Sequence, residues 1–336
     1  MAAAAATGSA SLETLLAEGG LDVSALHRLA DMLVSSHAAA ATGPGAGFLA
    51  RIEQLAASDS QRRELPRQLP HLQRRAGGKR VRQLPSGTPQ DILYDLAGRL
   101  AELAQRGLAT EANIVANRYL DLAPQGATGW ATLPLFLSLR AAEAGDTALA
   151  DAALAPSLPR LVAIGGLSGT GKSTLSRLLG ARLGRSPGAR VLRSDVFRKR
   201  LAGLAPETRL PPAHYTRHSD EKTYEALFES AYDHLACGSS VILDAVFISR
   251  SERDVAEALA YRLDVPFTGI WLEAPERDRI ARVAARNGDA SDATPEVVRE
   301  QSRLSIGELS GWHRMRVNRP LALIIPAARA VLERRR

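Results

Sequence analysis

The sequence predicts an α/β protein with a parallel sheet flanked by helices, preceded by a mostly α-helical region. After residue 160, short apolar runs alternate with amphipathic stretches of helical length, the pattern of strands joined by crossover helices. Before residue 145, leucines recur at helical spacing. An Ala- and Pro-rich stretch ending in APSLPR separates the two patterns. We therefore expect a helical region over 1–158 and a sheet domain over 159–336.

The composition is that of a folded, water-soluble chain. Its 336 residues are 45% hydrophobic and 24% charged, which suits two globular domains. The single cysteine, Cys237, excludes a disulfide framework and a multi-cysteine zinc site. It predicts a reducing, cytoplasmic location, and we expect this thiol to be buried and inert. No apolar run approaches the roughly 20 residues of a membrane helix, and the start MAAAAATGSA lacks a signal peptide's basic residues. We expect no membrane partner.

The net charge of +7 is unevenly distributed. Residues 62–82 carry eight basic side chains and one acidic, and residues 160–336 carry 29 basic and 21 acidic. A basic half fits nucleic acid, and it fits equally a nucleotide together with a phosphorylated product. Charge alone leaves both partners open.

Five segments of the first region have apolar residues at helical spacing. We expect helices over 11–36, 47–60, 90–107, 109–120 and 131–144. Residues 61–90, which include QRRELPRQLPHLQRRAGGKRVRQLPSGTP, show neither helical nor strand periodicity. Their Arg, Pro, Gln and Gly content predicts a basic loop.

The second region alternates regularly between strands and helices. Strands are expected over 161–164, 189–195, 240–247, 267–274 and near 314–318. Helices are expected over 173–184, 221–238, 251–263, 276–288 and near 321–335. Strands joined in this way lie parallel, with helices on both faces.

The segment GGLSGTGKST at 165–174 carries the clearest chemical signal. It matches G-x-x-x-x-G-K-[ST] between a strand and a helix, the context of a phosphate-binding P-loop. Glycines allow the loop to wrap a phosphate, and the helix N-terminus adds partial positive charge. Lys172 should reach the β- and γ-phosphates, and the Ser173 hydroxyl should bind Mg²⁺. The expected contacts of the cofactors ATP and Mg²⁺ are Gly166, Leu167, Ser168, Gly169, Thr170, Gly171, Lys172, Ser173 and Thr174.

The segment RSDVFRKR at 193–200 places Asp195 at the end of the second strand. Ligands of open α/β sheets bind at the carboxyl ends of strands. Asp195 should therefore face the acceptor, as a base or an orienting group, with a helix cap as the alternative. Arg198 is expected to hold the acceptor or a phosphate. Lys199 and Arg200 are expected to be solvated.

Weaker candidates lie elsewhere in the second region. Asp244 ends the apolar run VILD and is a candidate Mg²⁺ ligand, with local hydrogen bonding as the alternative. Tyr215 and Tyr224 are candidates for the acceptor pocket or for ordinary packing. His214 and His218 lack a third ligand nearby and are expected in a substrate loop or at the surface.

The stretch RDRIARVAARNGDASDA places three arginines on one helical face. Arg282 and Arg286 are expected to act from a mobile lid and neutralise charge on the transferred phosphoryl group. Arg279 is a weaker candidate for that role. The alternative is a solvated, charged helix.

Together, GGLSGTGKST, RSDVFRKR, VILDAVF and LEAPERDRIARVAARNGDASDA resemble P-loop kinases of the gluconate kinase-like, zeta toxin-like and chloramphenicol phosphotransferase-like family. The resemblance covers about 160–336. It implies an AAA-like P-loop fold with a five-stranded parallel sheet, and Asp195 as the acceptor-side acid. The function it implies is ATP-dependent transfer of the γ-phosphoryl group to a hydroxyl of a small molecule. The expected catalytic residues are Lys172, Asp195, Arg282 and Arg286, and the expected acceptor contacts are Asp195, Arg198 and Tyr215.

Two other functions fit the same motifs. A polynucleotide or tRNA-linked kinase would use the same loop and strand-end aspartate, although no aromatic–basic interleaving typical of single-strand platforms is seen. A non-catalytic ATP-binding regulatory module would bind ATP without consuming it. Acceptor-dependent turnover separates these alternatives.

Residues 90–144 resemble the closing helices of an aminoglycoside phosphotransferase-like domain, through DILYDLAGRLAELAQRG, NRYLDL and LPLFLSLRAAEAG. That family requires an HGDxxxxN loop and a later Mg²⁺-binding aspartate. The chain runs HLQRRAGGKRVRQLPSGTP where these are expected. We therefore expect a degenerate N-terminal region without kinase activity of its own.

Overall fold

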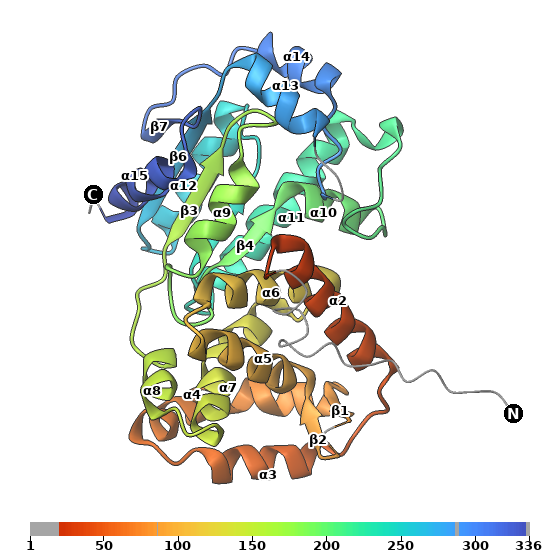
Figure 1. Ribbon diagram of the computed structural model, residues 1–336, viewed down its shortest axis with the longest axis vertical. Helices are drawn as coiled ribbons and strands as arrows, with labels where there is room; N and C mark the ends of the chain where they lie inside the picture. The colour runs from red at the N-terminus through yellow and green to blue at the C-terminus, as the bar shows by residue number, and fades with distance from the viewer. Residues whose placement is uncertain (1–19, 86, 286–288, 334–336) are drawn as a thin grey trace, which may run out of the picture.

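A computed structural model describes residues 20–85, 87–285 and 289–333. A helical part and a sheet-containing part lie along the long axis of the molecule, and helices α2 and α6 lie at their junction (Figure 1). No helix within these ranges is long and apolar enough to cross a membrane.

The helical part packs around a single apolar core. Its helices are α2 (Val23–Ala39), α3 (Gly45–Leu55), α4 (Asp59–Gly77), α5 (Ile92–Gln105), α6 (Ala109–Leu122), α7 (Gly126–Glu143) and α8 (Thr147–Ala153). Strands β1 (Val81–Gln83) and β2 (Pro89–Asp91) form a short antiparallel pair. Phe48, Tyr94 and Phe136 meet edge to face in the core. Of the helix expected over 11–36, residues 11–19 lie outside the described part of the chain.

The expectation of a basic loop over 61–90 is wrong, because most of this segment is helix α4. Ser58 caps this helix and forms a capping box with Gln61. The helix buries a polar stripe at helical spacing, consisting of Gln61, Glu64, Gln68 and Arg75 with Leu72. Each polar member of the stripe has a partner; Arg75, for example, pairs with Asp91 at 2.7 Å. A search for apolar periodicity misses such a helix.

The second part contains the expected five-stranded parallel sheet, in the order β4-β5-β3-β6-β7. Its strands are β3 (Leu161–Gly165), β4 (Arg190–Arg193), β5 (Val241–Asp244), β6 (Phe267–Glu273) and β7 (Trp312–Arg316). Its α-helices are α9 (Lys172–Gly180), α10 (Ser194–Leu201), α11 (Arg217–Ala236), α12 (Arg250–Arg262), α13 (Glu276–Ala284), α14 (Pro295–Ser302) and α15 (Leu321–Glu333), with a 3-10 turn at Pro212–His214.

Helices cover both faces of the sheet, as the sequence predicts. The central strand β3 is wholly buried and alternates its side chains between two apolar clusters. Val162 and Ile164 pack with residues of α9 and α15, whereas Leu161 and Ala163 pack with residues of α11 and α12. This packing fixes the carboxyl end of β3, where the glycine-rich motif of the sequence begins.

Helix α6 of the helical part covers the outer edge of strand β4. The Asn117 side chain accepts a hydrogen bond from the Val191 N–H at 2.7 Å and donates to the Ala189 carbonyl at 3.2 Å. The Asn113 side chain donates to the same carbonyl at 3.0 Å. Both asparagines are buried. Two side-chain amides thus pair with the edge strand as a neighbouring strand would.

Candidate active site

The turn from β3 into α9 is built by glycines in conformations that other residues rarely adopt. Gly166, Gly169 and Gly171 have φ of 138°, 83° and 94°. A Cβ on Gly169 would lie 2.6 Å from the carbonyl oxygen of Arg279 in helix α13. The loop therefore needs glycine there both for its backbone conformation and for close contact with α13.

Lys172 is the first residue of α9, directly after the left-handed Gly171. Its ammonium group donates to the Gly166 carbonyl at 2.8 Å and so lies across the loop. The Ser168 N–H donates to the Gln301 side chain of α14 at 2.8 Å. The loop is held from both sides, with the helix N-terminus facing the cleft.

A cleft of 1190 Å³ opens at the carboxyl ends of the strands. It brings together seven of the side chains that the sequence singled out, from three helices, a strand end and a loop. They are Lys172, Ser173, Asp195, Arg198, Tyr215, Asp244 and Arg282. Ser168, Gly169, Gly171 and Thr174 also line the cleft, whereas Gly166, Leu167 and Thr170 are not among its lining residues.

Asp244 ends β5 and is 4% exposed. Its Oδ2 atom makes no hydrogen bond and lies 3.4 Å from the guanidinium Nε of Arg193. This buried carboxylate oxygen and the Ser173 hydroxyl, which line the same cleft, are oxygen donors of the kind that Mg²⁺ prefers. Within the described ranges, no group of three or more His, Cys, Asp or Glu side chains could hold a metal. Mg²⁺ in phosphate sites needs only one or two protein oxygens besides waters and phosphates. These residues therefore fit Mg²⁺.

Asp195 lies in the first turn of α10 and faces the cleft. Burial raises the pKa of its carboxyl above the ordinary range, and the charges of Arg193 and Lys172 partly oppose that rise. Its carboxylate is therefore a better proton acceptor than that of a solvated aspartate.

Two residues expected around Asp195 have defined partners. Arg198 pairs with Asp220 at 2.7 Å, and its guanidinium lies over the Tyr215 ring at 5.3 Å. The Tyr215 hydroxyl donates to Asp292 at 2.7 Å. Arg198 and Tyr215 thus form one wall of the cleft with a carboxylate from after α13.

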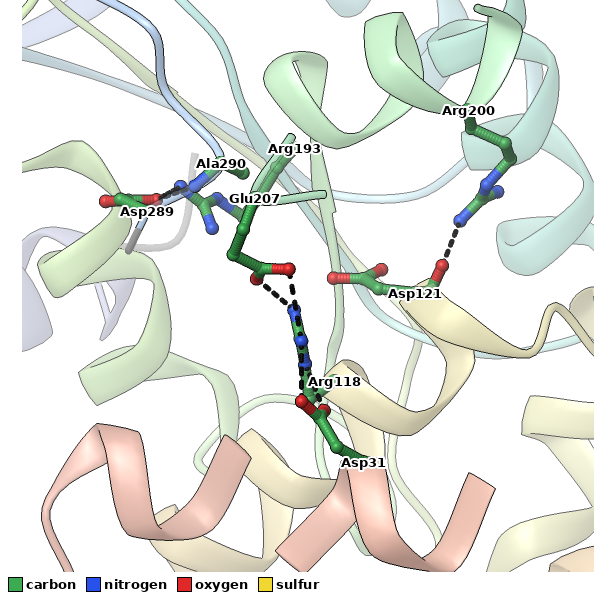
Figure 2. Close-up of polar contacts among 8 residues, drawn as sticks. All are labelled: Asp31, Arg118, Asp121, Arg193, Arg200, Glu207, Asp289 and Ala290. Carbon is green, nitrogen blue, oxygen red and sulfur yellow. Dashed lines mark hydrogen bonds and ion pairs between the residues drawn. The ribbon is translucent and has the colours of Figure 1, made fainter. Parts of the chain in front are cut away.

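The expectation that Lys199 and Arg200 are solvated is wrong. Lys199 is 1% exposed and its ammonium pairs with Asp292 at 3.0 Å. Arg200 donates to the Asp121 carbonyl oxygen of α6 at 3.4 Å (Figure 2). Helix α10 packs on neighbours on several sides. Residues that follow the strand end by a few positions are therefore not exposed to solvent here.

The three arginines expected in the lid differ in their surroundings. Arg282 lines the cleft and donates to the Val317 carbonyl at 2.9 Å and the Gly169 carbonyl at 3.4 Å. Arg279 is buried and donates to the Ser302 hydroxyl, so it joins α13 to α14. Arg286 lies outside the described residues.

The other candidates have structural surroundings. Tyr224 lines the cleft, and its hydroxyl accepts a hydrogen bond from the Phe247 N–H at 3.0 Å. His214 and His218 are exposed. Cys237, which we expected to be buried, is only partly buried at the end of α11, where burial raises the pKa of its thiol.

Sequence reasoning missed the charged network behind the cleft. Arg193 pairs with Asp289 (Figure 2) and also with Asp244. Asp292 joins Lys199, Tyr215 and the Leu210 N–H. The only sequence signal is a pair of aspartates in the stretch after α13, which reads equally well as a solvated loop.

The strand–glycine loop–helix unit, with carboxylates at the neighbouring strand ends, defines a P-loop nucleotide-binding domain. Residues 161–305 match a family model described as an AAA domain. The match agrees with the P-loop domain that the motifs predict. It does not reach the helical part.

Two curated relatives match part of the chain. An uncharacterized protein of Mycobacterium tuberculosis (strain ATCC 25618 / H37Rv) is 32% identical over 142 residues, 41% of this chain and 28% of that protein. An adenylyl-sulfate kinase of Myxococcus xanthus (strain DK1622) is 36% identical over 118 residues, 35% of this chain and 59% of that protein. The chain therefore spans between about a quarter and three fifths of the length of these relatives.

Two solved structures align with about half of the chain. A gluconokinase from Sinorhizobium meliloti 1021 aligns with a TM-score of 0.38 and 20% identity over 53% of this chain and 93% of that chain. The APS kinase CysC of Mycobacterium tuberculosis, in complex with AMPPNP and APS, aligns with a TM-score of 0.38 and 19% identity over 53% of this chain and 100% of that chain.

Proposed function

We propose that the protein is an ATP-dependent kinase that transfers the γ-phosphoryl group to a hydroxyl of a small molecule. The observation that supports this proposal is one cleft lined by both groups of candidate residues. Lys172, Ser173 and Asp244, the candidates for ATP and Mg²⁺, form its nucleotide side, and Asp195 and Arg198, the candidates for the acceptor, form its acceptor side. The adenylyl-sulfate kinase among the relatives supports a hydroxyl acceptor.

The nucleotide side supplies positioning and charge neutralisation. N–H groups of the glycine loop and the N-terminus of α9 cradle the phosphates. Lys172 exchanges its carbonyl contacts for the phosphates, and Arg282 adds a second positive charge from α13. Ser173 and Asp244 hold Mg²⁺, which when bound neutralises charge on the phosphates.

On the acceptor side, Asp195 takes the hydroxyl proton. The acceptor oxygen forms a bond to the γ-phosphorus while the bond from that phosphorus to the β,γ-bridging oxygen breaks. The electron pair of the broken bond leaves with ADP, and the proton moves to the Asp195 carboxylate. Arg198 and Tyr215 orient the acceptor. Most of the rate enhancement comes from this positioning and from electrostatic stabilisation.

The test is ADP release from ATP and Mg²⁺ by the purified chain against sugars, sugar acids, nucleosides, aminoglycosides and short RNAs. We expect acceptor-dependent release with a small molecule, abolished in Lys172→Ala. Release dependent on RNA alone would replace the proposal with a polynucleotide kinase. ATP binding without release for any acceptor would favour the regulatory module.

A further inference from the structure

The loop over 202–216, which joins α10 to α11, forms part of the acceptor side of the cleft. Leu210, Pro211 and Tyr215 line the cleft. The loop is held on its inner side by Asp292, which accepts from the Leu210 N–H at 3.0 Å and the Tyr215 hydroxyl at 2.7 Å. Asp292 therefore fixes the side of the loop that faces the cleft.

The outer side of the same loop is held by the helical part of the molecule. Arg118 of α6 donates from both Nη atoms to the Glu207 carboxylate, at 3.2 Å from Nη2. The Arg118 guanidinium also donates to Asp31 of α2, at 2.7 Å from Nε and 3.0 Å from Nη2. Figure 2 shows Arg118 lying between the two carboxylates. One guanidinium thus links α2, α6 and the acceptor-side loop.

Burial and geometry separate this contact from an ordinary surface ion pair. The Arg118 side chain is 8% exposed, and its hydrogen bonds to both carboxylates raise the pKa of the guanidinium. Bidentate pairing fixes the plane of the guanidinium as well as its position. An exposed pair would hold the loop only weakly.

The helix that carries Arg118 is itself fixed to the sheet. The preceding residue, Asn117, bonds the edge strand β4 through the Val191 N–H and the Ala189 carbonyl. Strand β4 leads directly into α10, which carries Asp195. Arg118 therefore holds the acceptor-side loop at a set distance from the strand that places the proposed base.

We propose that Arg118 is a positioning residue for the acceptor-side loop, so that the helical part forms the outer support of the acceptor site. The functional half of this inference rests on the proposed kinase activity. The structural half does not, because the position of the loop can be followed without turnover.

The structural test is amide hydrogen exchange of the intact protein, followed by mass spectrometry on peptides from 202–216. Glu207→Gln and Arg118→Ala should each speed exchange in this loop about tenfold, the effect of losing a charged hydrogen bond. The double variant should be no faster than the faster single variant, and Arg118→Lys should restore part of the protection. Arg106→Ala, an exposed arginine after α5, is the matched control and should change nothing.

Two outcomes would overturn the proposal. In one, exchange in 202–216 is unchanged in Glu207→Gln and Arg118→Ala. In the other, β4 and α6 loosen as much as the loop in Glu207→Gln, which would make the contact a general stability element.

The kinetic test uses an acceptor that the ADP-release panel identifies. Glu207→Gln should raise the KM for that acceptor about tenfold while leaving the KM for ATP unchanged. A fall in kcat with both KM values unchanged would count against positioning. If no acceptor supports turnover, the kinase proposal fails while the exchange experiment still decides the role of Arg118.

Discussion

The two sides of the cleft are encoded in different ways. The nucleotide side is largely one continuous segment, Gly166–Thr174, whose shape follows from glycine conformations between a strand and a helix. The acceptor side is assembled from α10, the loop over 202–216, α11 and the stretch after α13. Lys199 and Asp292, which pair there, are 93 residues apart in the sequence. A local motif therefore defines the nucleotide side, whereas tertiary contacts define the acceptor side.

The two sides of the cleft are also held in place by different kinds of interaction. Backbone conformation and close packing against α13 shape the glycine loop. Ion pairs and hydrogen bonds between distant segments, centred on Asp292 and Arg193, shape the acceptor side. Variants on the two sides should therefore fail in distinguishable ways.

The largest effect is expected on the acceptor side, from Asp195→Asn. The amide cannot accept the hydroxyl proton, so kcat should fall about 10³-fold, within the range of general-base catalysis. ATP affinity, measured by calorimetry, should be unchanged. In the wild type, activity should fall as the pH drops through the raised pKa of Asp195, because the protonated carboxyl is not a base. A normal kcat in this variant would show that Asp195 is not the base.

The next largest effect is expected from Asp292→Asn, which tests the tertiary contacts. The variant leaves the buried ammonium of Lys199 without its carboxylate, which should lower the free energy of unfolding by about 3 kcal/mol. Urea denaturation measures this loss. Glu296→Gln, an exposed acidic residue nearby, is the control and should change the midpoint little. Equal stability of both variants would show that the pair contributes nothing.

On the nucleotide side, Gly169→Ala should act through the backbone. Its φ of 83° and the Arg279 carbonyl 2.6 Å from the added Cβ force the loop to shift, at about 2 kcal/mol. We expect ATP affinity to weaken about tenfold or more, with the loop 202–216 unchanged in hydrogen exchange. Gly203→Ala, in the acceptor-side loop and also at positive φ, meets no atom within 4 Å and is the matched control for strain alone. Tight ATP binding by Gly169→Ala would refute the steric argument.

The smallest effect concerns His234 of α11, which is buried with its ring against that of Trp130. Burial, and secondarily the charge of Arg190, lower the pKa of the imidazole to about 3. The unfolded chain therefore binds a proton below about pH 6.5 that the folded chain does not. Stability should fall by about 2 kcal/mol from pH 6.5 to about pH 5.

The control for that prediction is His234→Gln. In urea titrations the variant should lose the fall in stability that His234 contributes, and it should keep a comparable fall from His27, whose pKa burial lowers to about 4. An identical slope in wild type and variant would contradict the assignment.

The sequence predicts the sheet and the glycine loop well because both follow from local patterns. Buried apolar runs locate the strands, and the glycine motif locates the loop. Helix α4 escapes prediction because its buried stripe is polar and satisfied by partners such as Ser138 and Arg185. Arg193 and Asp292 escape because their importance depends on which distant charges they meet, and no local pattern encodes that.

The pairing of Asn113 and Asn117 with strand β4 affects whether the chain associates with other copies in solution. An uncovered edge strand exposes N–H and carbonyl groups that readily recruit a strand from another molecule. In this protein two asparagine amides occupy those groups at Ala189 and Val191. The helical part thus protects the sheet from self-association. A chain shortened to the P-loop domain would expose this edge strand to pairing with other molecules.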